Sequence, residues 1–417
     1  MNSSTTNNTA ADLQCEVCGN NNIPLVLDLG KHPLCDDLIP IGDTRESEVY
    51  PIEILFCGQC ITAHQKFQVP KRTLFPTTYH YRSRFTEDVL RGMSALVDTC
   101  EQKLGTLQGK LVLDVGCNDG SLLDFFKAKG AVTIGIDPTD AVNDAFNKDH
   151  KLIQGYFDQN TAAQILQRHG VPDIVTFTNV FAHIENLPEL IASLLKLMGP
   201  QSMLVVENHY LGAVLDRFQF DTFYHEHPRT YSLTSLVQIA RNLGSNLTGV
   251  DFPSRYGGNI RVFIGGPKDF ASVIDWPEVQ EVLEKEKQFG ARLLDLQSTI
   301  ERWKSSTKTR IDELVARHGR LSAKGFPGRA AILIKLLNLD SDIIEAVYEK
   351  PGSMKIGHYI PGTRIPIKSD DEFWALQHKP TVILNLAWHI SSEISSYFQK
   401  HGYSGEIVNI LNPEELV

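Results

Sequence analysis

Val112-Leu-Asp-Val-Gly-Cys-Asn-Asp-Gly120 is the segment from which the fold of this 417-residue chain can be predicted. An apolar run ends at Val115 and leads into a turn with two glycines, after which a helical pattern begins near Ser121. Glycine lacks a Cβ atom, so the backbone at Gly116 and Gly120 can approach a ligand closely. A strand, a glycine turn and a helix in this order are typical of an α/β sheet.

Short β-branched runs alternate with helical stretches after this segment. Strands are expected at 132–136, 173–176 and 203–207. The alternation predicts a mostly parallel sheet within residues 71–270. Asp137 ends the second strand about 20 residues after the glycine turn, where such a fold presents an acid to the hydroxyls of a ribose. Asn179 follows the fourth strand, whose end faces the same crevice.

The composition of the glycine turn distinguishes between two nucleotide-binding folds. A dinucleotide fold expects G-x-G-x-x-G over a pyrophosphate, whereas this turn reads G-C-N-D-G and includes Asp119. An acidic loop is a poor phosphate cradle and suits a cationic cofactor. The turn resembles the first motif of the class I S-adenosylmethionine (SAM) methyltransferases.

This resemblance implies a set of contacts with SAM. Asp114 would face the amino-acid end of the cofactor, and Asp137 would face its ribose. Asp158 is expected near the adenine. The full set of expected cofactor-binding residues is Asp114, Gly116, Asn118, Gly120, Asp137, Asp158 and Asn179.

Four of the seven cysteines form two pairs, Cys15-Glu-Val-Cys18 and Cys57-Gly-Gln-Cys60. Zinc prefers tetrahedral thiolate ligands, and a C-x2-C turn can place two sulfurs on one ion. A module this small buries little apolar surface, so a metal would stabilise it directly. We therefore expect Cys15, Cys18, Cys57 and Cys60 to bind a structural zinc in a β-rich module over residues 13–70. The alternatives are buried thiols without a metal, or a redox pair.

The remaining regions complete the expected domain organisation. Residues 1–12 are polar and are expected to form a flexible tail. Residues 271–318 are strongly charged with apolar residues at helical spacing, which predicts a long amphipathic helix that joins domains as a solvated connector. Strand and helix patterns then resume over residues 319–417 and predict a second, smaller α/β domain.

Asp221-Thr-Phe-Tyr-His-Glu-His227 contains two imidazoles, a phenol and a carboxylate within seven residues. Histidine ionises near neutrality, so it can remove a proton at physiological pH and return it. A metal cluster is a competing interpretation, and each histidine alone could be an ordinary core or surface residue. The density of functional groups favours a catalytic segment.

Several stretches together resemble the sugar C-methyltransferases of deoxysugar biosynthesis. They are the paired cysteines, Asn179-Val-Phe-Ala-His183, the Tyr224–His227 segment, Tyr256-Gly-Gly-Asn-Ile-Arg261 and Tyr359-Ile-Pro-Gly-Thr-Arg-Ile-Pro-Ile367. The resemblance spans nearly the whole chain. It implies a zinc module, a SAM-binding middle domain and a C-terminal Rossmann-like domain that helps to hold a nucleotide-linked keto-sugar.

The family resemblance also implies a reaction at a ring carbon next to a ketone. A base removes the weakly acidic proton while the carbonyl oxygen takes up negative charge, and the carbon then attacks the methyl group of SAM. By motif match His227 would be the base, with Tyr224 and Glu226 orienting or polarising the sugar. His225 is the alternative base, and His183 could reach the sugar carbonyl or a hydroxyl.

Further residues are expected to contact the acceptor. Tyr81 and Ser83 resemble a segment that lines the sugar pocket in this family. Arg261 belongs to the Tyr-Gly-Gly stretch, and Arg364 stands where a histidine is more usual. Because nucleotide phosphates need cations, Arg82, Lys324, Arg329 and Arg364 are candidates to bind them.

Composition excludes several classes of partner. Lys and Arg number 40 against 50 Asp and Glu, which gives a net charge of −10 and argues against nucleic-acid binding. No stretch approaches the roughly 20 apolar residues that a membrane span needs, and the N-terminus lacks the features of a secretion signal. We expect a cytoplasmic protein whose partner is a small molecule, and the oligomeric state stays open.

Two alternative functions remain at this level. The first keeps SAM but transfers the methyl group to oxygen or nitrogen, which needs a weaker base and no enolate. The second is a zinc-module adaptor without activity that retains a degenerate methyltransferase fold. The intact glycine turn, Asp137 and the Tyr224–His227 segment argue against the adaptor.

Overall fold

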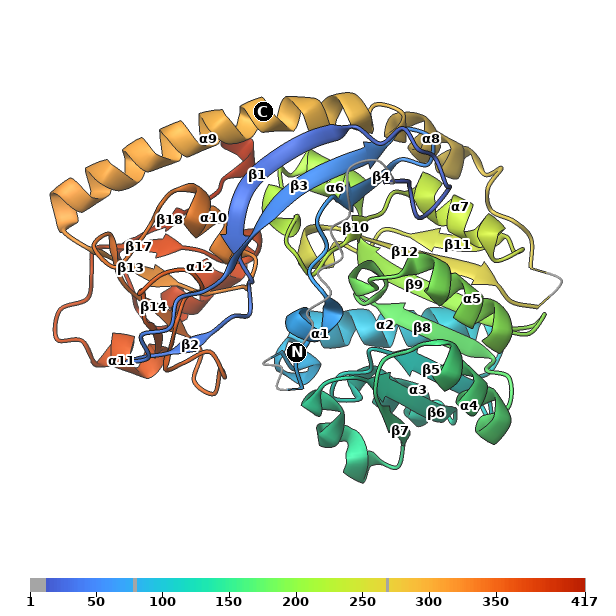
Figure 1. Ribbon diagram of the computed structural model, residues 1–417. Coiled ribbons are helices and arrows are strands. Elements are labelled where there is room, and N and C mark those ends of the chain that lie inside the picture. The colour runs from blue at the N-terminus through green and yellow to red at the C-terminus, as the bar shows by residue number, and fades with distance from the viewer. Residues whose placement is uncertain (1–12, 78–80, 268–269, 417) are drawn as a thin grey trace, which may run out of the picture.

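The computed structural model describes residues 13–77, 81–267 and 270–416. Figure 1 shows the central sheet, in cyan, green and yellow, on one side and the C-terminal sheet, in orange and red, on the other. The long helix α9 (Phe289–His318), in light orange, runs along the top of the view over the C-terminal sheet and the blue N-terminal strands. The flexible tail predicted for residues 1–12 lies outside the described residues. Among the described helices, none combines the length and the apolar character that a membrane span requires.

The central sheet has seven strands in the order β11-β12-β9-β8-β5-β6-β7. In chain order they are β5 (Leu111–Val115), β6 (Val132–Asp137), β7 (Lys151–Gln154), β8 (Ile174–Thr178), β9 (Met203–His209), β11 (Leu247–Asp251) and β12 (Asn259–Gly265). The first five are parallel, and β12 and β11 form an antiparallel edge. Because β6 and β8 lie on opposite sides of β5, the carboxyl ends of β5 and β8 flank the crevice in which such sheets bind ligands.

Helices cover both faces of the central sheet. On one face lie α2 (Glu87–Leu104) and α3 (Ser121–Ala128), and on the other lie α4 (Gln159–His169), α5 (Leu187–Leu197) and α7 (Leu233–Asn242). Successive side chains of a strand point to opposite faces, so Val112 packs with α2 and α3 while Leu113 packs with α4 and α5. Apolar side chains on both faces explain why this strand has no polar alternation.

The N-terminal module is a four-stranded antiparallel sheet in the order β1-β3-β4-β10. Its first three strands are β1 (Leu25–Pro33), β3 (Val49–Cys57) and β4 (Thr62–Gln65). The fourth, β10 (Arg229–Thr230), comes from the middle of the chain and pairs with β4. A short strand, β2 (Ile39–Pro40), pairs with β15 (His358–Tyr359) of the C-terminal part. Strand pairing therefore joins the module to both the middle and the C-terminal parts of the chain.

The segment predicted as one solvated helix contains α8 (Pro277–Glu286) and α9. The apolar face of α9 is not solvated. Phe289, Leu293, Leu296, Ile300 and Trp303 are at most 3% exposed and belong to the core that includes β1, β3 and the C-terminal sheet. The expectation of a solvated connector was therefore wrong, because sequence spacing shows an apolar face but not what covers it.

The C-terminal sheet has five parallel strands in the order β16-β14-β13-β17-β18. They are β13 (Leu321–Lys324), β14 (Ile344–Glu349), β16 (Ile367–Ser369), β17 (Val382–Asn385) and β18 (Glu406–Asn409), with helices α10 (Ala330–Leu336), α11 (Asp370–Ala375) and α12 (Ser391–Lys400). The predicted fold class, a β-rich N-terminal module with two Rossmann-like α/β sheets, is confirmed. The exact domain boundaries stay predictions.

Candidate active site

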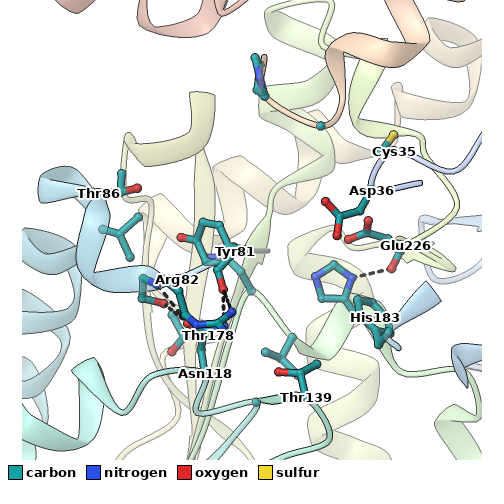
Figure 2. A pocket seen from close by; sticks show the side chains of 18 of the residues that line it. Cys35, Asp36, Tyr81, Arg82, Thr86, Asn118, Thr139, Thr178, His183 and Glu226 are labelled. Atoms are coloured by element: carbon teal, nitrogen blue, oxygen red, sulfur yellow. Dashed lines mark hydrogen bonds between the residues drawn. The ribbon is translucent and has the colours of Figure 1, made fainter. Parts of the chain in front are cut away.

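A cavity of about 950 Å³ lies at the carboxyl ends of the central strands. The loops after β5, β6 and β8 line it, together with the loops after β13 and β14 and with Tyr224, Glu226 and His227. Figure 2 shows Asn118 and Thr139 on one side of this pocket and His183, Glu226 and Asp36 on another. Pockets of about 300–1,000 Å³ hold drug-sized ligands, so this space can take two reactants.

The glycine turn after β5 forms one wall of the cavity. Gly116 has a φ of +76°, and a Cβ atom there would lie 2.4 Å from Cγ2 of Val180, so the position requires glycine. Asn118 accepts a hydrogen bond from the backbone N–H of Ser83 at 3.0 Å and donates one to the carbonyl of Tyr81 at 3.2 Å. The turn thereby holds Tyr81 and Ser83 against the cavity, which both of them line.

Asp137, the last residue of β6, faces the cavity beside the glycine turn. Its Oδ2 accepts a hydrogen bond from the backbone N–H of Asn118 at 2.9 Å, and its Oδ1 accepts two from Thr139 at 2.8 and 2.6 Å. Burial raises the pKa of this carboxyl group above its ordinary value. Because each carboxylate oxygen has two lone pairs, Oδ2 can also accept a hydroxyl of a bound ligand.

Asp114 lies in β5 just before the glycine turn and is only 3% exposed. Its Oδ1 accepts a hydrogen bond from the hydroxyl of Thr176 at 2.6 Å. Burial raises the pKa of the carboxyl group to about 7, and the neighbouring Asp137 adds to the rise. A cationic ligand group at this wall would restore the charged form of the carboxylate.

Of three other residues predicted for the cofactor site, one lines the cavity and two lie outside it. Asn179 lines the cavity after β8. Gly120 does not line it; this residue precedes α3, and a Cβ atom there would lie 2.8 Å from the Cβ atom of Ala145. Asp158 also lies outside, because its side chain caps α4 by accepting the backbone N–H of Thr161 at 2.8 Å. The neighbouring residues 155–157 line the cavity in its place.

His227 lines the cavity and is 7% exposed. Its Nδ1 lies 2.9 Å from the carbonyl oxygen of Thr222, which can only accept, so Nδ1 carries the proton. The other ring nitrogen, Nε2, has no hydrogen-bond partner among the described residues and is not sealed from the cavity. Burial, with His183 and His209 adding to it, holds the pKa of His227 well below its ordinary value. The imidazole is therefore neutral at physiological pH, with a free acceptor nitrogen.

Tyr224, His183 and Glu226 surround this imidazole on the cavity wall. The Tyr224 ring centroid lies 4.3 Å from that of His227, and the His183 centroid lies 4.9 Å away. His183 Nδ1 donates to the carbonyl oxygen of Glu226 at 2.6 Å, as Figure 2 shows. Burial raises the pKa of the Tyr224 phenol and lowers that of His183. The phenol therefore keeps its proton and can donate a hydrogen bond to a ligand oxygen.

His225 does not line the cavity. Residues 224–227 form a tight turn in which the backbone N–H of His227 donates to the carbonyl of Tyr224, and this turn directs His225 toward the N-terminal sheet. There its Nε2 lies 3.1 Å from the carbonyl oxygen of Tyr50. The structure thus separates the two histidines, and the expectation of His225 as an alternative base is corrected.

Lys324 and Arg329 line the cavity, but both are paired within the protein. Lys324 Nζ lies 2.6 Å from both carboxylate oxygens of Asp370, and both side chains are 3% exposed. Arg329 lies over the Trp388 ring, with Nε 3.3 Å from Asp221 and Nη1 donating to Gln219 at 3.2 Å. Neither cation extends freely toward a phosphate.

Arg261 and Arg364 lie outside the cavity, contrary to their expected substrate contacts. Arg261, on β12, forms a buried ion pair with Glu207 at 2.7 Å. Arg364 donates hydrogen bonds to the carbonyls of residues 43–45 and so fixes a loop of the N-terminal module. The partners of both arginines are distant in sequence. These contacts therefore hold separate segments of the chain together around the site.

The cavity wall also includes residues that the sequence did not single out. His209, the last residue of β9, has its ring centroid 5.3 Å from that of His227. Burial lowers the pKa of His209 to about 3. Cys35 and Asp36 reach the cavity from the N-terminal module. The position of His209 at a strand end was a usable signal, whereas no local pattern marks residues 35 and 36.

Cys15, Cys18, Cys57 and Cys60 come together at one end of the N-terminal sheet. All four sulfur atoms lie within 4.8 Å of one another, with Cys15 and Cys60 at 3.3 Å and Cys18 and Cys57 at 3.5 Å. Tetrahedral zinc with Zn–S bonds of about 2.3 Å spaces its sulfurs about 3.8 Å apart. The four thiols are free, and their geometry fits a closed zinc site.

Three family models match consecutive parts of the chain. They describe a zinc binding domain (residues 15–75), a methyltransferase domain (84–249) and a C-methyltransferase C-terminal domain (254–409).

Comparison with individual proteins gives matches of different extent. The C-methyltransferase NovU of Streptomyces niveus is 28% identical over 387 residues, which cover 91% of each chain. A ubiquinone biosynthesis O-methyltransferase of Rhodopseudomonas palustris (strain BisA53) is 32% identical over 113 residues, or 26% of this chain and 44% of that protein. Magnesium protoporphyrin IX methyltransferase of Synechocystis PCC 6803, solved with bound SAM, is 17% identical over 43% of this chain and 80% of its own, with a TM-score of 0.33.

Proposed function

The chain belongs to a family of SAM-dependent C-methyltransferases with a zinc binding domain, and from this premise we propose that it methylates a carbon next to a ketone in a nucleotide-linked keto-sugar. The membership confirms the resemblance noted in the sequence. The observation that carries the proposal is the neutral His227, whose Nε2 opens on the cavity that Asp114, Gly116 and Asp137 also line.

The residues around the glycine turn fit SAM. The turn approaches the cavity without a side chain at Gly116, so a ligand can lie against the backbone there. Asp137 would accept the ribose hydroxyls, and Asp114 would face the ammonium group of the amino-acid end. When bound, SAM supplies a methyl group on a positively charged sulfur.

The acceptor carbon loses its proton to Nε2 of His227 in the proposed reaction. The C–H electron pair moves into the ketone, and the oxygen becomes an enolate. The Tyr224 phenol, which burial keeps protonated, is placed to donate a hydrogen bond to that oxygen, while the neutral His183 ring packs against that of His227. The carbon then forms a bond to the methyl group as the C–S bond breaks. Thr222 holds the imidazole in the tautomer that this step requires.

The size of the cavity and its position between two Rossmann-like sheets support a nucleotide-linked sugar as the acceptor. A methyl donor alone would not need walls from both sheets, whereas a nucleotide-linked acceptor can extend from His227 toward the loops after β13 and β14. Tyr81 and Ser83 would contact the acceptor near the glycine turn. Because Lys324 and Arg329 are paired, we expect them to shape this wall rather than to bind phosphate as free cations.

Cofactor affinity is expected to depend on pH through Asp114. A carboxyl group with a pKa of about 7 is about nine-tenths ionised at pH 8 and about one-tenth ionised at pH 6. Because the carboxylate attracts the ammonium group of SAM, binding should be about tenfold weaker at pH 6 than at pH 8. Calorimetric titration of the wild-type protein with SAM measures this. The Asp114→Asn variant should bind more weakly with little pH dependence, and wild-type affinity that is constant over this range would show that Asp114 does not face the cofactor's charge.

Methyl transfer to carbon can be tested directly with SAM that carries a ¹³C-labelled methyl group. The protein is incubated with thymidine-, guanosine- and cytidine-linked keto-sugars, and the product is examined by NMR. A labelled methyl carbon coupled to a ring carbon supports the proposal. A label attached to oxygen or nitrogen with the same acceptors would contradict it and favour the alternative methyltransferase. Failure to bind SAM at millimolar concentration would favour an adaptor.

A further inference from the structure

The two segments of the N-terminal module that bear the cysteine pairs are directly attached to the catalytic segment. Beyond Cys60, the chain continues into β4, and β4 pairs with β10 two residues after His227. The backbone N–H of Gln65 also donates to the carbonyl of Pro228 at 2.8 Å. The strand that follows the proposed base is therefore part of the sheet that carries the metal ligands.

The first cysteine pair makes a second connection through Glu16, which lies between Cys15 and Cys18. The Glu16 carboxylate accepts hydrogen bonds from the backbone N–H of Leu187 at 3.2 Å and from Gln68 at 3.0 Å. Its Oε2 also lies 2.7 Å from Nη1 of Arg229. Glu16, inside the turn that bears two metal ligands, thus contacts Arg229 of β10, two residues after His227.

Arg229 has a fully buried side chain and joins three separate segments. Its Nε donates to the hydroxyl of Tyr231 at 3.1 Å, and its Nη2 donates to the carbonyl of Ile184. Ile184 directly follows His183, whose ring packs against that of His227. A buried guanidinium needs a charged partner, so its position depends on Glu16.

We propose that the Glu16–Arg229 ion pair positions His227 and His183, and that the zinc site thereby sets the geometry of the catalytic segment. Cys15 and Cys18 would hold zinc and so keep their turn fixed, the turn fixes Glu16, and Glu16 holds Arg229 between the segments that carry His183 and His227. Glu16 and Arg229 are positioning residues, since neither lines the cavity.

The Glu16→Gln variant tests this assignment in the zinc-loaded protein. Glutamine keeps an acceptor oxygen for Leu187, removes the charge that faces Arg229, and exchanges the oxygen that accepts from Gln68 for an amide NH2 group. The matched control is Glu53→Gln in β3 of the same sheet, where Glu53 pairs with Lys66, also at 2.7 Å, but on the surface. Both variants should retain one zinc per chain and bind SAM within about twofold of the wild type.

Two readouts are expected to separate the variants. In Glu16→Gln, amide hydrogens of residues 224–230 should exchange about tenfold faster, because local opening becomes easier. Its kcat should fall about 10- to 100-fold with an unchanged KM for SAM, since small displacements of catalytic groups are costly. Glu53→Gln should match the wild type in both.

Equal amide exchange in residues 224–230 for the two variants would overturn the assignment. Loss of zinc or of SAM binding in Glu16→Gln would also overturn it, because the pair would then serve the fold as a whole. The inference uses the proposed role of His227, but amide exchange needs no acceptor. The outcome therefore stays distinct from a failure of the proposed reaction.

Discussion

Replacing His227 by asparagine is expected to reduce the rate of methyl transfer about 10²- to 10⁴-fold, the range that a general base contributes. The asparagine amide can still donate to the carbonyl of Thr222, as Nδ1 of His227 does in the wild type. The variant would therefore lose only the free acceptor nitrogen on the cavity wall. Single-turnover measurements at saturating SAM report the chemical step.

His225→Asn is the matched control for this experiment, because His225 lies in the same turn and faces away from the cavity. This variant should keep the wild-type rate within about fivefold, the range of a modest change in positioning. SAM affinity should be unchanged in both variants, since neither histidine belongs to the glycine-turn wall. A larger loss in His225→Asn than in His227→Asn would reverse the two assignments.

Loss of one zinc ligand is expected to have the second large effect. The binding free energy of a structural zinc, about 10–16 kcal/mol for small zinc modules, is part of the folding free energy. Cys57→Ser should therefore release the metal and unfold the N-terminal sheet. Because β10 belongs to this sheet and follows His227, methyl transfer should be lost as well. Elemental analysis for zinc and thermal unfolding measure the first two effects.

Cys100→Ala is a suitable control, because Cys100 is buried on α2 in a different core. This variant should keep one zinc per chain and lose only the stability expected for a small change of volume. A Cys57→Ser protein that retained one zinc per chain and the wild-type unfolding temperature would show that these four cysteines are not a metal site.

The parts of the site that depend on local sequence were predictable. Gly116 follows β5 and Asp137 ends β6, the parallel strand beside it, so both lie at the same edge of the sheet and line the cavity as expected. The cysteine pairs were predictable for a similar reason, because two C-x2-C turns can meet at only a few geometries. The α/β fold followed from strand and helix alternation.

Other parts depend on contacts between distant segments, which the sequence does not reveal. From the sequence alone, Arg261 is a candidate cation for a ligand. In the fold, Glu207 of β9 lies beside it and forms an ion pair with it. Lys324 likewise forms an ion pair with Asp370, the first residue of α11. The direction of His225 depends on a single tight turn and on the carbonyl of Tyr50 in another sheet. In each case a buried charge or a backbone acceptor far along the chain determines the outcome.

Proton exchange at the acceptor carbon tests the central claim most directly. The wild-type protein is mixed in D₂O with a keto-sugar that it methylates and with the demethylated product of SAM, and the acceptor is followed by NMR. The account predicts that one hydrogen next to the ketone is replaced by deuterium at least as fast as methyl transfer occurs, and that His227→Asn suppresses this exchange. Full retention of that hydrogen in the wild-type protein, with an acceptor that is methylated at the same carbon, would contradict proton removal by His227.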